Sequence, residues 1–255
     1  MKLIITPLYG IPDIIPGDKL GKIIVNAIVD NNILLKNFDI LVVTQKIVSK
    51  SENRYVALSE VSPSIQAMDI AKQAQKDPRI VELIIRESRE ILRVRPGLMI
   101  VEHRLGFICA NAGIDQSNIK NESGLADKSV LLLPENPDLS AKKIRESIQQ
   151  HFGLQVGILV IDSFGRAWRL GTIGTAIGFS GLPGLIDLRG KADMYGRILQ
   201  TTEVGAADEL ASAASLVMGQ ADERVPAVHV SGFPYPLREA NHIELIRPVG
   251  TDLFR

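Results

Sequence analysis

The feature that most constrains the fold is a short apolar run that ends in a carboxylate. Residues 157–161 read GILVI, and Asp162 and Ser163 follow directly. The run is too short for a typical helix and strongly apolar, so it predicts a buried strand. A charged side chain therefore emerges at the carboxyl end of a buried element, where an aspartate is a common ligand for a hard metal ion.

The residues after this strand are typical of an anion site. Arg166 and Arg169 carry planar guanidinium groups that suit phosphate or carboxylate. Glycines that allow close approach of backbone N–H groups to an anion follow at positions 171, 174, 178 and 181. Together with Asp162, these residues predict a metal-assisted phosphate site.

Composition excludes several classes of protein. The 255 residues contain 29 Lys plus Arg and 29 Asp plus Glu, so no overall field recruits nucleic acid or an anionic membrane. The first apolar run breaks at Pro7, unlike a signal peptide, and no apolar stretch is long enough to span a bilayer, so we expect a cytoplasmic protein. The single cysteine, Cys109, excludes an intramolecular disulfide and a cysteine-cluster metal site, and its apolar flanks predict a buried strand residue.

Periodicity along the chain predicts an α+β fold. We expect mixed sheets with packed helices in one domain over 1–255, made of two closely joined subdomains without a linker. The predicted strands are 2–6, 39–43 (continuing to 50), 98–102 and 106–109 as a hairpin, 129–134, 157–161, 198–202 and 225–230. The predicted helices are 18–30, 64–75, 78–92, 137–152 and 203–218.

Four details of this assignment are specific enough to test. Asp18 is the expected N-cap of the first helix. The charges between Glu82 and Arg93 alternate in sign, which is typical of a solvated helix face without chemistry. The strand, helix and strand between 129 and 161 are expected to pack as one layer of helix on sheet. The helix at 206–218 is rich in small residues, which permit close packing inside one subunit or between subunits.

Several catalytic chemistries lack their residues. The four histidines are scattered without an HExxH pair, and no GxSxG, GxGxxG or P-loop pattern is present. A haloacid-dehalogenase-type phosphatase with Asp162 as nucleophile needs a second Asp where Phe164 stands. What remains is a hard metal on the oxygen atoms of Asp162, Ser163, Asp115 and Gln220, with phosphate neutralised by basic side chains.

Several ordered motifs support a more specific interpretation. They are NAGIDQSN at 111–118, VIDSFGRAWRLGTIGTAIGFSG at 160–181, DMYGRIL at 193–199, ADELASAASLVMGQAD at 207–222 and VPAVHVSG at 225–232, with YGIP at 9–12 and VVTQKIVSKSENR at 42–54. Taken together, they resemble the coenzyme F420-0:L-glutamate ligases, also called gamma-glutamyl ligases. The resemblance runs nearly end to end, without the flavin reductase extension that some relatives carry.

The resemblance implies an activity. It implies a GTP-dependent, GDP-forming ligase that attaches L-glutamate to coenzyme F420-0 through an acyl phosphate, then adds a further glutamate through its gamma-carboxylate. It also implies magnesium or manganese, two ions in all, with potassium as a further candidate. The family fold implies a homodimer with the nucleotide groove near the subunit boundary.

The resemblance also assigns residues by motif. The metal ligands would be Asp115, Asp162, Ser163 and Gln220. Nucleotide would contact Tyr9, Gly10, Ile11, Pro12, Gln45, Lys46, Lys50, Asn118, Met218, Gly219, Ala221, Asp222 and Glu223. Chemistry adds Arg166 and Arg169 as catalytic clamps on phosphate or carboxylate, with Arg189, Lys191 and Arg197 as further clamp candidates.

Two departures from the family pattern affect the metal site. Gln220 stands where relatives can carry Glu, which lowers the negative charge of the site by one, and Ser163 stands where Thr is frequent. Both can still ligate through oxygen. The alternative function is a metal-dependent phosphatase or a nucleotide-binding regulatory protein on the same scaffold.

Overall fold

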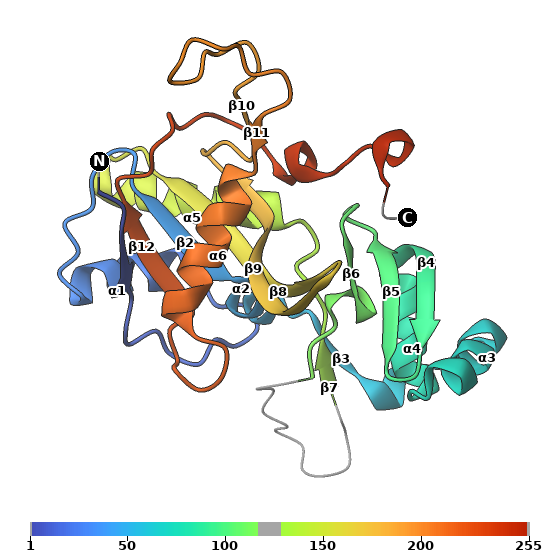
Figure 1. Cartoon of the computed structure of the whole chain (residues 1–255). Helices are drawn as coiled ribbons and strands as arrows, with labels where there is room; N and C mark the ends of the chain where they lie inside the picture. Colours follow the sequence, from blue (N-terminus) through green and yellow to red (C-terminus); the bar gives the residue numbers. More distant parts are fainter. Residues whose placement is uncertain (1, 117–128, 254–255) are drawn as a thin grey trace.

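The centre of the molecule is a five-stranded sheet with the strand order β1-β12-β2-β8-β9 (Figure 1). The computed structural model describes residues 2–116 and 129–253. The strands of this sheet are β1 (Ile4–Pro7), β12 (Ala227–Ser231), β2 (Ile40–Thr44), β8 (Gly157–Arg166) and β9 (Arg169–Ser180). This mixed arrangement of sheets and helices confirms the predicted α+β class.

The directions of the strands bring three carboxyl ends to one edge of the sheet. β12 runs antiparallel to both β1 and β2, and β2 runs parallel to β8, so β1, β2 and β8 share one direction. The last residue of β2 pairs with Ile161, so Asp162 lies just past the point where β8 loses that neighbour. The prediction that the strand ends at Ile161 was wrong, because pairing with β9 carries β8 on to Arg166.

Helices cover both faces of this sheet. On one face lie α1 (Leu20–Asp30) and α5 (Pro137–Phe152), and on the other lies α6 (Ala206–Met218) (Figure 1). Alternate residues of β8 divide between the two sides, as the pleat requires. Ile158, Val160 and Phe164 join the core cluster of α1 and α5, whereas Leu159 and Ile161 join the cluster of α6.

The glycines of β9 are explained by helix packing. A Cβ on Gly174 would stand 2.3 Å from the Ala211 carbonyl oxygen of α6, and one on Gly178 would stand 2.5 Å from Pro137 of α5. Only glycine lets both helices approach the strand this closely. Helix packing therefore explains why Gly174 and Gly178 are glycines, without the predicted approach of their backbone N–H groups to an anion.

A smaller part of the molecule is built on a second sheet. It consists of β4 (Ser88–Arg95), β5 (Leu98–His103) and β6 (Ile108–Ala110), with α3 (Ile65–Ala74) and α4 (Pro78–Arg86) beside it (Figure 1). A two-stranded sheet of β3 (Tyr55–Ala57) and β7 (Ser129–Leu131) lies between the two parts, and β10 (Ile186–Asp187) pairs with β11 (Glu203–Val204) in a projecting excursion. One hydrophobic cluster contains Leu41 of the large sheet and Met99 of the small one. The division into subdomains stays a prediction.

Several predicted elements change type or partner. Residues 45–51 form the helix α2 (Gln45–Ser51) rather than a continued strand, because Ile47 and Val48 are buried against the core. The predicted helix at 78–92 ends at Arg86, because pairing with β5 turns the following residues into β4.

Three other local predictions were wrong. Asp18 does not cap α1, since its carboxylate accepts from the Ile15 N–H at 2.9 Å instead. β7 pairs with β3 in its own small sheet, so β7, α5 and β8 do not form one layer. The predicted strand at 198–202 reduces to a single bridge between Ile198 and Ala192.

The charged stretch predicted as a solvated face is partly buried. Glu82 is 8% exposed and accepts from the Ser64 N–H. Glu87 Oε2 accepts from Arg104 Nε at 2.9 Å and Arg54 Nη2 at 3.1 Å. Those arginines also bind the carbonyl oxygens of residues 133–135. Helical periodicity cannot reveal this cluster, because Arg54 comes from the residue before β3 and Arg104 from the β5–β6 turn.

A buried histidine fastens the C-terminal segment to the rest of the chain. His242 Nδ1 lies 2.6 Å from Asp138 Oδ2, and its Nε2 lies 2.9 Å from the Leu105 carbonyl oxygen. Both partners are acceptors, so the protonated ring, which donates from both nitrogens, satisfies both of them. Burial alone would lower the pKa of His242, but these hydrogen bonds raise it above its usual value.

This geometry predicts a pH dependence. Because the folded pKa of His242 exceeds its unfolded value, its contribution to stability is fully present below about pH 6.5 and is lost as pH rises through the raised pKa. We expect wild type to lose more unfolding free energy than His242→Gln as pH rises across this range. Urea unfolding at a series of pH values measures it, and parallel curves for the two proteins would contradict it.

Candidate metal and phosphate site

The carboxyl edge of the large sheet gathers predicted residues from distant segments. Gln45 opens α2 directly after β2, and Asp162 lies in β8, the neighbouring strand. The loop from α6 enters β12 at the same edge, where the Thr44 N–H donates to the Pro226 carbonyl oxygen. The Leu8 N–H, after β1, donates to the Ala227 carbonyl oxygen. The predicted segments therefore share one edge.

The Asp162 carboxyl group has a raised pKa. Burial raises its pKa to about 6, and the charge of Asp115 adds to this rise. Hydrogen bonds from the Ser163 backbone and the Gln45 side chain, together with the charge of Lys46, act in the opposite direction. Ionised Asp162 is therefore unfavourable in this buried position, and a bound cation would stabilise it.

A residue that we did not predict orients Gln45. The Ser49 hydroxyl donates to Gln45 Oε1 at 2.9 Å, which leaves the amide NH₂ to donate to Asp162. Both Gln45 and Ser49 are buried. Their four-residue spacing would have indicated this pairing only if residues 45–51 had been recognised as a helix.

Asp115 forms an ion pair with Lys46 at the site. The Lys46 Nζ lies 2.7 Å from Asp115 Oδ2, and the two side chains are 26% and 18% exposed. Asp115 itself is held by a backbone bridge to Leu131 of β7. The ion pair thus joins the start of α2 to the segment that follows β6.

The other two predicted ligands meet each other. The Ser163 hydroxyl donates to Gln220 Oε1 at 2.8 Å. Since neighbouring residues of a strand point to opposite faces, Ser163 faces α6 whereas Asp162 faces Gln45 and Lys46. The predicted ligands therefore form two pairs, Asp115 with Asp162 and Ser163 with Gln220, on opposite sides of β8.

These donors fit magnesium or manganese better than zinc. Among residues 2–116 and 129–253, no group of three or more His, Cys, Asp or Glu side chains could form a metal cage. Magnesium is usually held by one or two carboxylates, with water and substrate phosphates completing the shell. Cys109 does not change this chemistry, because burial raises the pKa of its thiol to about 12. Its predicted burial is confirmed.

The other predicted nucleotide contacts lie along this edge, because residues 9–12 follow β1 and residues 218–223 run from the end of α6 toward β12. Tyr9 is exposed, and Asn31 fixes the 9–12 loop by bonding both the Tyr9 N–H and its carbonyl oxygen. Gly219 ends α6 with a positive φ of 75°, and the Ala221 N–H donates to the Glu223 carboxylate. Lys50 lies one helical turn after Lys46 in α2. Asn118 lies outside the described residues, and the nucleotide contacts stay predictions.

The arginines are placed at some distance from Asp162. Arg166 and Arg169 pair across the end of the β8–β9 hairpin, about 13 Å along the strand from Asp162. Arg166 donates to the Gly171 carbonyl oxygen. Arg189 forms ion pairs with Asp187 and Glu203 in the β10–β11 excursion, where Lys191 and Arg197 also lie. Their roles as clamps stay predictions.

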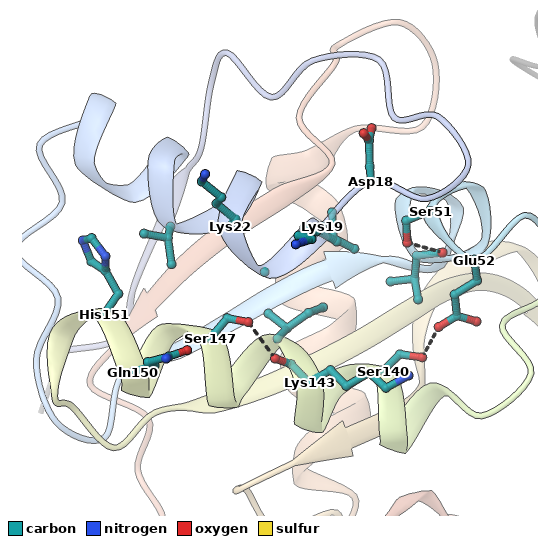
Figure 2. A pocket seen from close by; sticks show the side chains of 15 residues that line it. Asp18, Lys19, Lys22, Ser51, Glu52, Ser140, Lys143, Ser147, Gln150 and His151 are labelled. Atoms are coloured by element: carbon teal, nitrogen blue, oxygen red, sulfur yellow. Dashed lines mark hydrogen bonds between the residues drawn. The ribbon is translucent and has the colours of Figure 1, made fainter.

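A groove of about 640 Å³ lies elsewhere, between α1 and α5 (Figure 2). Lys19, Lys22 and Lys143 stand around it, and Ser147 and His151 lie along α5. Its described lining residues include none of the predicted site residues. Its lysines are exposed, and the hydroxyl of Ser147 donates to the Lys143 carbonyl oxygen of its own helix. We assign it no function.

Comparison with known proteins identifies the class. A model of the F420-0:gamma-glutamyl ligase family matches residues 10–232. A coenzyme F420:L-glutamate ligase from Methanothermobacter thermautotrophicus is 45% identical over 248 residues, covering 96% of each chain. Proteins of the same name from Methanopyrus kandleri and Methanosarcina mazei are 43% and 35% identical, covering 94% and 100% of this chain and 92% and 96% of their own.

The likeness extends over nearly the whole of each sequence. The chain is therefore an enzyme of the ligase class. It belongs to the F420-0:gamma-glutamyl ligase family, as its motifs predicted. Within the described ranges, no helix has the length and apolar character needed to cross a bilayer.

Proposed function

We propose that this protein is a GTP-dependent ligase that joins L-glutamate to coenzyme F420-0 and then adds a further glutamate through its gamma-carboxylate. One observation carries the proposal: residues predicted as metal ligands and nucleotide contacts come from separate segments and meet at one edge of the sheet. The names of the relatives supply the coenzyme and L-glutamate as substrates, and GTP is carried over from the motif resemblance.

The proposed reaction has two stages. The terminal phosphate of GTP passes to the acceptor carboxylate, giving an acyl phosphate and GDP. The amine of glutamate then attacks the acyl carbon, the amide bond forms, inorganic phosphate leaves and the amine loses its proton. Activation is needed because a bare carboxylate is a poor electrophile toward an amine. A divalent ion would neutralise phosphate charge when bound.

The residues of the chain have separable roles in this proposal. On one side of β8, the carboxylates of Asp115 and Asp162 would bind the divalent ion. On the other side, Ser163 and Gln220 provide neutral oxygen ligands. Lys46 and Lys50 bind phosphate. The loop after β1 and Asp162 lie three strand spacings apart, about 14 Å, so a ligand touching both must be extended. A nucleoside triphosphate has this character.

An assay of products tests the function. Protein incubated with F420-0, glutamate, GTP and manganese should give products heavier by glutamate units, together with GDP. Magnesium, potassium and other nucleotides are varied in parallel. Phosphate release without F420-0 or glutamate would instead indicate a phosphatase. GTP binding without turnover would indicate a regulatory protein.

We also propose a homodimer. The small residues of α6 do not supply a free interface, because Ala207, Ala211 and Ala214 are buried in the core of the same chain. Exposed apolar residues are found on the β8–β9 hairpin, where Trp168 and Leu170 are 87% and 99% exposed. Light scattering after size-exclusion chromatography measures the mass in solution.

A further inference from the structure

The ion pair between Lys46 and Asp115 lies on the Asp162 side of the proposed metal site. The Nζ lies 2.7 Å from Asp115 Oδ2, and both side chains are largely buried. The charges of Asp115 and Lys46 also act on Asp162, in opposite directions. One ammonium group thus serves two nearby carboxylates.

A divalent ion and this ammonium compete for the same carboxylate. An ion bound to Asp115 would repel a lysine at hydrogen-bond distance from the same group, more strongly at a partly buried site than in water. Lysine has a flexible four-carbon stem, so its charge can move without a change in the helix that carries it. The start of α2 is held independently, because Gln45 is fixed by Ser49 and Asp162.

We propose that Lys46 is an internal counter-ion that a divalent metal displaces from Asp115, and that the displaced ammonium then binds the phosphates of the nucleotide. This inference rests on the proposed metal and nucleotide site. It makes the two ligands cooperative, because metal binding releases a phosphate-binding group and phosphate holds that group away from Asp115. By reciprocity, nucleotide must tighten metal binding as much as metal tightens nucleotide binding.

Manganese binding without nucleotide tests the inference. Free manganese is measured by electron paramagnetic resonance during titration of the full-length protein. Lys46→Met should bind manganese about ten-fold more tightly than wild type, because the competing charge is gone. GTP should tighten manganese binding by wild type but much less by Lys46→Met. Circular dichroism checks that each variant is folded.

Further variants separate charge from packing. Lys46→Gln keeps a hydrogen-bond donor without the charge and should also bind manganese more tightly. Lys46→Arg keeps the charge and should bind as weakly as wild type. Lys22→Met removes one charge from the exposed start of α1 and controls for net charge.

The outcomes distinguish two failures. If wild type binds manganese in the presence of GTP and loses it in Asp115→Asn, while folded Lys46→Met and Lys46→Gln show no gain, the counter-ion role is refuted and the metal site stands. If neither wild type nor Lys46→Met binds manganese with or without GTP, the proposed metal site is refuted and the inference falls with it.

Discussion

Replacing Asp162 with Asn should abolish ligation while making the metal-free protein more stable. Turnover should fall by about a thousand-fold or more, because the change removes a charged ligand from the site where phosphate charge is stabilised. The shape of the side chain is kept, and Asn can still accept the hydrogen bond from Gln45. Product formation is followed by mass spectrometry of the glutamylated coenzyme.

The gain in stability follows from the pKa of Asp162. Its folded value of about 6 lies above the ordinary 3.8, so the ionised form opposes folding at neutral pH. Removing the charge should raise the unfolding free energy by on the order of 1 to 2 kcal/mol, after allowance for partial exposure. The gain should be present above about pH 6 and disappear below pH 3.8, where the carboxyl is neutral in both states.

Asp208→Asn is the matched control. Burial also raises the pKa of Asp208, but this residue lies on α6 and accepts from the Ala176 N–H at 2.9 Å. Asn can accept the same bond, so the control should keep full activity. Retained turnover in Asp162→Asn would refute its role as a ligand. Equal loss in both variants would attribute the effect to lost packing.

Of the variants discussed, Glu87→Gln should lose the most unfolding free energy, about 3 kcal/mol, while the residues of the candidate site stay as they are. Glu87 holds Arg54 and Arg104 in a partly buried cluster, and neutralising it leaves two cations without their counter-charge. Chemical denaturation measures the loss. Glu146→Gln breaks an exposed pair with Lys142 at 4.0 Å and should change the free energy by less than about 0.5 kcal/mol.

Acid unfolding gives an independent test of the same cluster. Burial opposes the ionisation of Glu87, but the neighbouring His103, Arg104 and Arg54 outweigh it and lower its pKa from 4.5 to about 2. Its stabilising contribution is therefore present above pH 4.5 and is lost as pH falls toward 2. Wild type should lose stability over this range more steeply than Glu87→Gln. Identical acid limbs would contradict the assignment.

His103 adds a second acid-sensitive element. Its Nδ1 accepts from the Leu105 N–H, so the proton of the neutral ring is on Nε2. That atom lies 3.7 Å from Glu87 Oε2, longer than a direct hydrogen bond, so the N–H acts on the carboxylate as a nearby dipole. Burial lowers the pKa of His103, so the folded protein resists protonation here and loses stability as pH falls below the ordinary histidine value.

The sequence allowed much of the fold to be predicted where local patterns are strong. Asp77 and Pro78 open α4 as predicted, with the Asp77 carboxylate accepting from the Arg79 N–H, and the hairpin of β5 and β6 is confirmed. Predictions failed where distant partners decide. The β4 residues follow a helical period, yet they pair with β5, and nothing local to Glu87 indicates Arg54 or Arg104.

The candidate site shows the same division. Asp162 was found from its strand alone, whereas Asp115 and Gln220 became candidates by the elimination of other chemistries and then through the family resemblance. The structure brings Asp115 to Lys46 and Gln220 to Ser163. Ser49 was missed because its role depends on a helix that was not predicted. Sequence thus indicates the chemical type of a ligand, and topology decides which ligands meet.

The alternation of side chains along β8 sets a fixed spacing within the site. Asp162 and Ser163 are adjacent, so the separation of the two pairs of proposed ligands is determined by the thickness of one strand. A one-residue insertion before Asp162 would exchange the faces on which aspartate and serine stand, and would move the carboxylate to the opposite side of β8 while both side chains are kept.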